Sequence, residues 1–153
     1  MQEALASFGI DARVIELPAS ARTAPEAAKA VGCRVEQIAK SLVFRGLTSG
    51  RPVLVVTSGG NRVDEERLAA LLGEPVRQAE PDFVRERTGF SIGGVPPVGH
   101  FKSIETFLDE DLFRLEEIWA AAGTPNAVFK IRFADLVAIA GGRVVAIAQR
   151  ARG

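Results

Sequence analysis

A lysine set among apolar residues is the first candidate for chemistry in this sequence. Lys40 follows Ile38 and Ala39, precedes Ser41 and stands before an apolar run at 42–44; only four lysines accompany the 15 arginines. A cation held among apolar side chains can bind a phosphate or stabilise negative charge that develops on a reacting oxygen. The alternative, commoner for an isolated lysine, is a stem that packs on apolar surface while the ammonium group reaches solvent.

A glycine- and proline-rich loop is the second candidate. The segment from Gly93 to His100 reads GGVPPVGH. Glycines allow close backbone approach, and the two prolines stiffen the middle of the loop. Its free N–H groups suit a carbonyl oxygen, an oxyanion or a phosphate. A plain connection whose glycines only satisfy turn geometry is an equal alternative, and the phosphate-loop pattern GxxxxGK[ST] is absent.

The remaining polar candidates each have a simpler structural explanation. Thr23 can offer a hydroxyl to a ligand, but its spacing from Glu26 is that of a helix capping box. His100 can act as a general base or as a hydrogen-bonding group of the loop. Cys33 follows a helix-stopping glycine and has no nucleophile signature, so we expect an inert thiol. Lys130 and neighbouring cations fit the solvated face of a strand, with contact to an RNA backbone as the alternative.

Size and composition restrict the class of protein. The chain has 153 residues, 47% of them hydrophobic and 25% charged, which is typical of one globular domain. Its 19 basic and 19 acidic residues argue against a strongly basic DNA-binding protein, although a local patch can still contact phosphates. One cysteine and one histidine exclude an internal disulfide and the usual zinc ligand sets, so we expect no metal and no cofactor.

The sequence also gives no sign of a membrane or secretory segment. No apolar stretch approaches the roughly 20 residues that cross a bilayer. The start carries Glu3 and no basic flank before an apolar block, unlike a secretory signal. We therefore expect a cytoplasmic protein without a membrane partner.

Helical and extended patterns alternate along the chain, which predicts a mixed α and β domain. Glycine and proline positions and capping residues predict helices over 2–8, 24–31, 35–39, 65–72, 81–88, 112–122 and 134–140. About seven extended segments are expected over 12–17, 42–44, 53–57, 90–92, 104–108, 127–133 and 144–148. Lys40 would then lie where a short helix meets the first strand of a hairpin.

Two separated motifs resemble a known family. EQIAKSLVF at 36–44 and GFSIGGVPPVGH at 89–100 resemble the YbaK/ProX family of aminoacyl-tRNA deacylases, which is related to the editing domain of bacterial prolyl-tRNA synthetases. The segments 23–32, 122–131 and 135–148 are similar to further parts of that family, in the same order. The resemblance implies a single α+β domain over 1–153, with flanking helices and a curved, mixed, largely antiparallel sheet. It also implies hydrolysis of the ester of a mischarged aminoacyl-tRNA.

The resemblance assigns roles to individual residues. It implies that Lys40 is the main functional side chain and holds the phosphate of the terminal adenosine or the reacting ester. It implies that the amides of Gly93, Gly94 and Val95 stabilise the oxyanion, which suits an ester cleaved by water with part of the work done by the substrate. The remaining expected pocket residues are Thr23, Ser41, Gly99 and His100.

The amino acid that is removed stays open at this point. Alanine-editing relatives carry asparagine after the lysine, where this chain has Ser41. Cysteine, alanine and serine all remain candidates, because small pockets separate amino acids that differ by one methylene by only about 1–3 kcal/mol. The alternative to an enzyme is a binding module for an amino acid, a nucleotide or the tRNA 3′ end. The expected partners are aminoacyl-tRNA and, with it, prolyl-tRNA synthetase.

Overall fold

The structure is a computed structural model that describes residues 14–17, 23–90, 95–97, 104–123 and 127–149. The helix expected over 2–8, the start of the strand expected over 12–17 and most of the extended piece at 90–92 lie outside these ranges. Four of the expected site residues lie outside them as well: Gly93, Gly94, Gly99 and His100.

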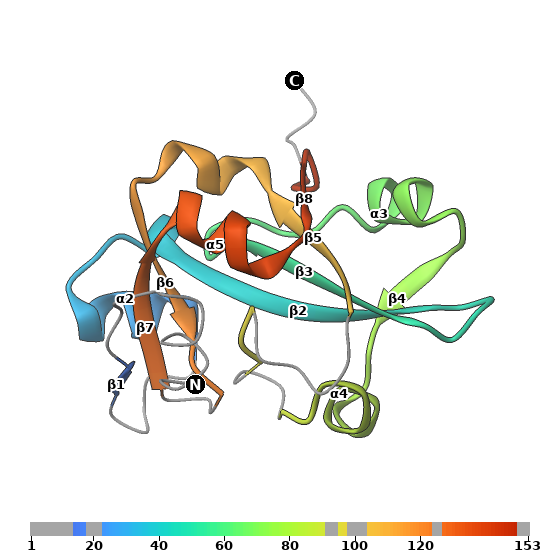
Figure 1. The fold of residues 1–153 in the computed structure, drawn as a ribbon, viewed down its shortest axis with the longest axis horizontal. Coiled ribbons are helices and arrows are strands. Elements are labelled where there is room, and N and C mark those ends of the chain that lie inside the picture. Colours follow the sequence, from blue (N-terminus) through green and yellow to red (C-terminus); the bar gives the residue numbers. More distant parts are fainter. Residues whose placement is uncertain (1–13, 18–22, 91–94, 98–103, 124–126, 150–153) are drawn as a thin grey trace.

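One mixed sheet of eight strands runs through the described residues (Figure 1), in the order β1-β7-β6-β2-β3-β5-β8, with β4 paired to β2. Four strand pairs are antiparallel and three are parallel, which confirms the expected α+β class. The long β2 and β3 curve across the middle of the molecule (Figure 1). The strands are β1 (Val14–Glu16), β2 (Ile38–Gly46), β3 (Pro52–Ser58), β4 (Val76–Gln78), β5 (Glu105–Asp109), β6 (Glu117–Ala121), β7 (Ala127–Arg132) and β8 (Arg143–Val145).

Four α-helices flank the sheet: α2 (Ala24–Val31), α3 (Glu65–Leu72), α4 (Pro81–Thr88) and α5 (Phe133–Ala140). Capping groups fix their ends as the sequence predicts. The Thr23 hydroxyl accepts from the N–H of Glu26 at the start of α2, and Asp64 accepts from two amides at the start of α3. Glycines in the left-handed conformation end all four helices. No described helix is long and apolar enough to cross a membrane.

Two expected helices are wrong, and the sheet explains both. The segment expected as a helix over 112–122 contains a short 3₁₀ helix, η2 (Glu110–Arg114), followed by β6. In β6, Ile118 and Ala120 are buried while their neighbours are more exposed, because the strand pairs with β2 and β7. The helix expected over 35–39 is reduced to the 3₁₀ helix η1 (Val35–Gln37).

Lys40 consequently lies inside β2 and not at the end of a helix. The apolar spacing from Val35 to Leu42 suits a helix, but pairing with β3 and β6 draws Ile38 and Ala39 into the sheet. Tertiary contacts of this kind override local helical periodicity.

The two edges of β2 are paired differently. On one edge, β3 pairs with it from Ala39 to Arg45. On the other edge, β6 pairs only with Ile38 and Ala39, and β4 pairs only from Phe44 to Gly46. No register of a described strand covers residues 40–43 on this second edge. The sheet therefore has a gap of four residues in the middle of one of its central strands.

Hydrogen-bond alternation decides which backbone groups face this gap. The N–H of Gly59 donates to the carbonyl of Ile38 at 2.6 Å, so even-numbered residues of β2 direct their backbone groups to β3. On the second edge, the carbonyl of Val43 accepts from the N–H of Ala79 at 2.9 Å. It follows that the N–H and C=O of Ser41 point into the gap.

Both faces of the central strands are buried. Val53, Leu54, Val55 and Val56 of β3 have no exposed surface. Val53 and Val55 pack in a cluster with side chains of α3, whereas Leu54 and Val56 pack in a larger cluster with side chains of α4 and α5. The frame around the gap is thus held by apolar packing on two sides.

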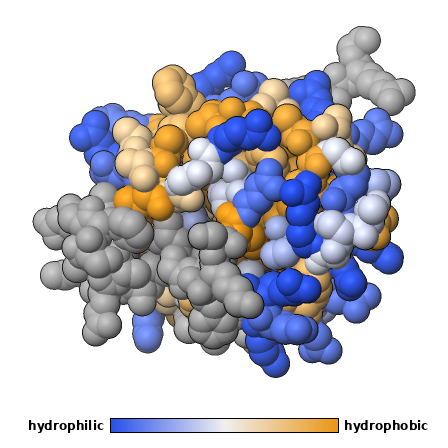
Figure 2. All heavy atoms as spheres, turned by 45° about the vertical axis from the view of Figure 1, so that its right-hand side comes forward, coloured by the Kyte–Doolittle hydropathy of each residue, from blue (hydrophilic) through white to orange (hydrophobic). Residues whose placement is uncertain are grey.

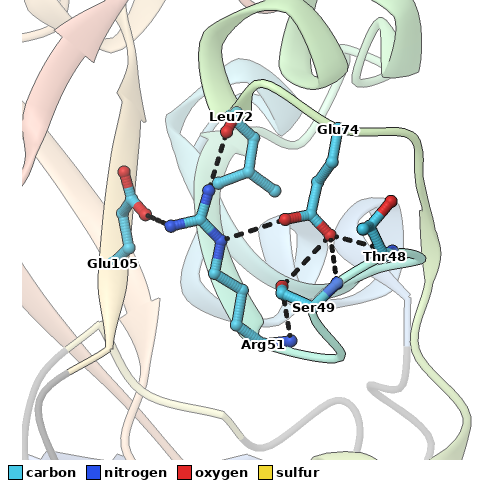
Figure 3. A network of polar contacts seen from close by, with 6 residues as sticks. All are labelled: Thr48, Ser49, Arg51, Leu72, Glu74 and Glu105. Atoms are coloured by element: carbon cyan, nitrogen blue, oxygen red, sulfur yellow. Dashed lines mark hydrogen bonds and ion pairs between the residues drawn. The ribbon is translucent and has the colours of Figure 1, made fainter.

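A polar network fixes the turn between β2 and β3 to the end of α3 (Figure 3). Glu74 accepts hydrogen bonds from the amides of Thr48 and Ser49 and from the Ser49 hydroxyl, and it pairs with Arg51 at 3.5 Å. Arg51 also donates to the carbonyl of Leu72 at 2.7 Å. The Ser49 amide is the main cause that lowers the pKa of Glu74.

We predict that Glu74→Gln destabilises the fold, because the neutral amide loses the ion pair with Arg51 and the charge that strengthens three hydrogen bonds. A lowered pKa means that this stabilisation is complete above the ordinary carboxyl pKa of 4.5 and is lost as the pH falls below it. Urea denaturation should therefore show a difference between wild type and variant at pH 7 that shrinks below pH 4.5. Glu86→Gln, on the exposed face of α4, is the control; a difference independent of pH would contradict the prediction.

Candidate functional site

A pocket of about 250 Å³ lies at the gap in β2. Residues of α2, β2, β6, β7 and α4 line it, and most of them are small and apolar. Adjacent residues of a strand point to opposite faces of the sheet, so a pocket that both Lys40 and Ser41 line must extend around the open edge. Seven of the lining residues are alanines: Ala24, Ala27, Ala39, Ala79, Ala120, Ala121 and Ala127.

The pocket brings together four of the expected site residues from three separate segments. Thr23 lies just before α2, Lys40 and Ser41 lie in β2, and Val95 comes from the glycine-rich loop. Val95 is only 2% exposed and directly follows Gly94 in the chain. The loop thus reaches the pocket at Val95, while the positions of the glycine amides lie outside the described residues.

Lys40 is partly buried and has no acidic partner among the described side chains. Burial lowers the pKa of its ammonium group, and the nearby Arg62 lowers it further. A cation that is partly desolvated and faces another cation is stabilised by any anion that enters the pocket. Lys40 therefore has the electrostatic character of an anion-binding group.

The buried carboxylate on this part of the sheet already has its own hydrogen-bond donors. Thr57, which lies opposite Lys40 in the β2–β3 register, donates its hydroxyl to Asp109 at 2.6 Å. Asp109 is fully buried and also accepts from the amide side chain of Asn61 at 2.8 Å and from the backbone N–H of Asp111 at 2.9 Å. These donors satisfy Asp109 without any contribution from Lys40.

Ser41 adds polar groups to an otherwise apolar wall. Its hydroxyl oxygen is buried and has no hydrogen-bond partner among the described residues. Its backbone N–H and C=O face the gap, as the pairing with β3 requires. A ligand in the pocket can therefore receive hydrogen bonds from the hydroxyl and the N–H, and can donate to the carbonyl.

Thr23 plays a different part from Ser41. It is exposed, and its hydroxyl donates to the Glu26 carboxylate at 2.9 Å while accepting from the Glu26 amide. The capping role expected from the sequence is confirmed, and Thr23 contributes to the pocket wall beside it. Cys33 does not line the pocket, and burial raises the pKa of its thiol, which fits the expected inert residue.

Several lining residues were not expected from the sequence. Trp119, Ala120 and Ala121 belong to β6, which the apolar spacing of this segment presents as a helix. Arg62, the cation near Lys40, was not expected either: it lies outside the pocket lining, in the irregular segment between β3 and α3, and carries no motif. The alternating burial of Ile118 and Ala120, which marks this wall as a strand, is visible only in the structure.

Comparison with known proteins agrees with this fold. The family described as the aminoacyl-tRNA editing domain matches residues 18–139, and the chain belongs to this family. A solved structure described as a proposed trans-editing enzyme for prolyl-tRNA synthetase superimposes with a TM-score of 0.92 at 50% identity, covering 97% of this chain and 94% of the other.

Two curated relatives cover most of the chain. The uncharacterized protein YwhH of Bacillus subtilis (strain 168) is 34% identical over 118 residues, which are 77% of this chain and 74% of YwhH. EbsC of Enterococcus faecalis (strain ATCC 700802 / V583), a proposed Cys-tRNA(Pro)/Cys-tRNA(Cys) deacylase, is 26% identical over 129 residues, or 84% of this chain and 78% of EbsC. The family resemblance seen in the sequence is therefore confirmed.

We predict that Lys40→Met leaves the protein as stable as the wild type or more stable, because it removes a desolvated cation beside Arg62. The lowered pKa of Lys40 means that wild-type stability rises with pH from that pKa towards the ordinary value of 10.5, and the variant should lack this rise. Thermal denaturation between pH 7 and 10 measures both effects. Lys29→Met, an exposed lysine of α2, is the control; a larger loss of stability in Lys40→Met than in this control would contradict the prediction.

Proposed function

We propose that this protein is a trans-editing deacylase of the cytoplasm, which hydrolyses the ester of mischarged aminoacyl-tRNA and releases free amino acid and tRNA. The observation that carries the proposal is the pair of uncompensated polar residues, Lys40 and Ser41, at the open edge of β2 in a member of the editing-domain family. A polar edge in an apolar pocket suits the small, polar end of an aminoacyl ester.

The pocket has room for an aminoacyl group. Its volume is about 250 Å³, and alanine side chains form much of its wall. Cysteine, alanine and serine are the proposed substrates, because the hydroxyl and backbone groups of Ser41 offer a small amino acid polar contacts in an otherwise apolar wall.

In the proposed reaction, water adds to the ester carbonyl carbon and the carbonyl oxygen becomes an oxyanion. The bond from this carbon to the ribose oxygen then breaks, the ribose oxygen takes a proton, and the amino acid leaves as a carboxylate. The Lys40 ammonium group would hold the phosphate of the terminal adenosine or the charge on the ester. The amides of Gly93 and Gly94 would stabilise the oxyanion, a role that the burial of Val95 in the pocket supports.

The proton transfers fall to the substrate and to water in this proposal. The described residues that line the pocket include no carboxylate, imidazole or thiol. The same observation favours a second candidate function, in which the pocket binds an amino acid, a nucleotide or the tRNA 3′ end without hydrolysis. The tRNA that is edited is proposed to be the product of prolyl-tRNA synthetase, since the similar solved structure is described as acting for that enzyme.

We predict that Lys40→Ala lowers the rate of deacylation by about 100-fold or more, in line with the loss of one group that stabilises an oxyanion. The measurement is the release of amino acid from tRNAs charged separately with alanine, cysteine, serine and threonine. Lys29→Ala should retain the wild-type rate. Unchanged turnover in Lys40→Ala would remove this residue from the mechanism, and saturable binding of the tRNA end without hydrolysis of any substrate would favour the binding module.

We predict that Ser41→Ala changes selectivity without weakening the fold. The buried hydroxyl has no hydrogen-bond partner in the described structure, so its removal should leave the free energy of unfolding unchanged or raise it. Hydrolysis of seryl-tRNA should fall roughly tenfold relative to alanyl-tRNA, as expected for the loss of one hydrogen bond. An equal fall for both substrates would show that the hydroxyl does not contact the side chain of the amino acid.

A further inference from the structure

Three arginines gather where β2, β4 and α4 meet. Arg45 of β2 lies directly opposite Arg77 of β4, and Arg87 lies in the last turn of α4. All three are exposed. Directly opposite residues of neighbouring strands project from the same face, and like charges in such a pair are destabilising. We refer to Arg45, Arg77 and Arg87 as the arginine patch.

An aromatic ring orders two members of the arginine patch. The guanidinium carbon of Arg45 lies 4.9 Å from the centre of the Phe83 ring, and that of Arg87 lies 5.3 Å from it. Stacking fixes a guanidinium plane but does not use its N–H donors. The ring thus positions two cations within about 10 Å of each other, and their N–H groups stay available for other partners.

Acidic side chains do not neutralise the arginine patch. None of its members forms an ion pair with a described acidic residue. On α4, Val84 and Thr88 are buried, whereas Asp82 and Glu86 are exposed and lie about half a turn away from that buried face. Arg87 lies on the flank between these two faces.

Some of the basic residues elsewhere are neutralised by acidic neighbours. Four of them pair with carboxylates at 3.3–3.8 Å. In particular, Lys130, one of the cations considered for RNA contact from the sequence, pairs with Glu117. The paired basic residues are Arg34, Arg51, Arg67 and Lys130.

The arginine patch adjoins the pocket. Arg77 is next to Gln78 in the chain, and Gln78 lines the pocket. Arg45 lies on the same face of β2 as Ser41, four residues further along, or about 13 Å at the rise of a strand. In Figure 2, which brings the tip of the β2–β3 hairpin forward, hydrophilic side chains gather on this side of the molecule.

We infer that the arginine patch binds the sugar-phosphate backbone of the tRNA acceptor end while the aminoacylated 3′ terminus occupies the pocket. The inference rests on the proposed function and extends it from the ester to the body of the RNA. Arginine pairs with phosphate through two parallel hydrogen bonds. With zero net charge on the whole chain, a local cluster of unpaired guanidinium groups is the feature that attracts a polyanion.

The test compares arginine variants in the binding of uncharged tRNA across a range of salt concentrations. In Arg45→Gln/Arg77→Gln, the slope of log affinity against log salt should fall by about two, one for each lost phosphate contact, with weaker binding at physiological salt. Arg45→Lys/Arg77→Lys keeps both charges and should keep most of the slope. Circular dichroism melting of each variant checks the fold.

Arg143→Gln is the matched control. Arg143 is also exposed, also stacks on a phenylalanine, with its guanidinium carbon 5.0 Å from the centre of the Phe107 ring, and has no ion pair among the described residues. It belongs to β8, at the far end of the strand order from the pocket. Its replacement should leave both the affinity and the slope unchanged.

Four results would overturn the inference. The first three are no tRNA binding by the wild type, a wild-type slope in Arg45→Gln/Arg77→Gln, and an equal loss in Arg143→Gln. The fourth is a loss of binding to prolyl-tRNA synthetase in Arg45→Gln/Arg77→Gln with unchanged tRNA binding, which would assign the patch to a protein partner. Measuring hydrolysis as well distinguishes this inference from the proposed function. Binding of tRNA through the patch without deacylation would contradict only the proposed function. Deacylation with a salt slope that does not depend on the patch would contradict only the inference.

Discussion

The interrupted pairing along one edge of β2 is the constraint on which the rest of the site depends. β6 and β4 both pair with this edge, but they leave residues 40–43 without a neighbouring strand. A continuous partner would use the backbone groups of Ser41 and fill the space that now forms the pocket. The gap also lets Lys40 and Ser41, which project from opposite faces of the strand, line one cavity. The pocket at this position follows from the absence of one stretch of sheet among the described strands.

Polar groups along the central strands fall into two kinds. Asp109 at the end of β5 and Glu74 at the turn between β2 and β3 are supplied with donors, and they hold the ends of strands and turns in place. Lys40 has no described counter-charge, and the buried hydroxyl of Ser41 has no described partner. A folded chain leaves such groups unsatisfied only at a cost in free energy. Their concentration in one small pocket is the physical basis for assigning it to a ligand.

The sequence predicted well those elements whose ends are fixed by nearby residues. α2, α3 and α4 begin and end as expected, because capping hydroxyls and carboxylates, early prolines and left-handed glycines act within a few residues of one another. β6 was predicted wrongly, since the spacing of its apolar residues suits a helix when it is considered alone. Its conformation is decided by pairing with β7 and with β2, and β2 lies far away along the chain.

By itself, then, the sequence determined the fold class and the family, and it singled out Lys40, Ser41 and Val95, which the structure brings to one pocket. The tertiary structure decided that Lys40 belongs to a strand, that the pocket opens through a break in the sheet, and that Arg45 and Arg77 lie side by side. Local hydrogen bonds and backbone preferences can be read from neighbouring residues. Strand pairing joins segments far apart in the chain, so no local pattern specifies where a partner strand stops.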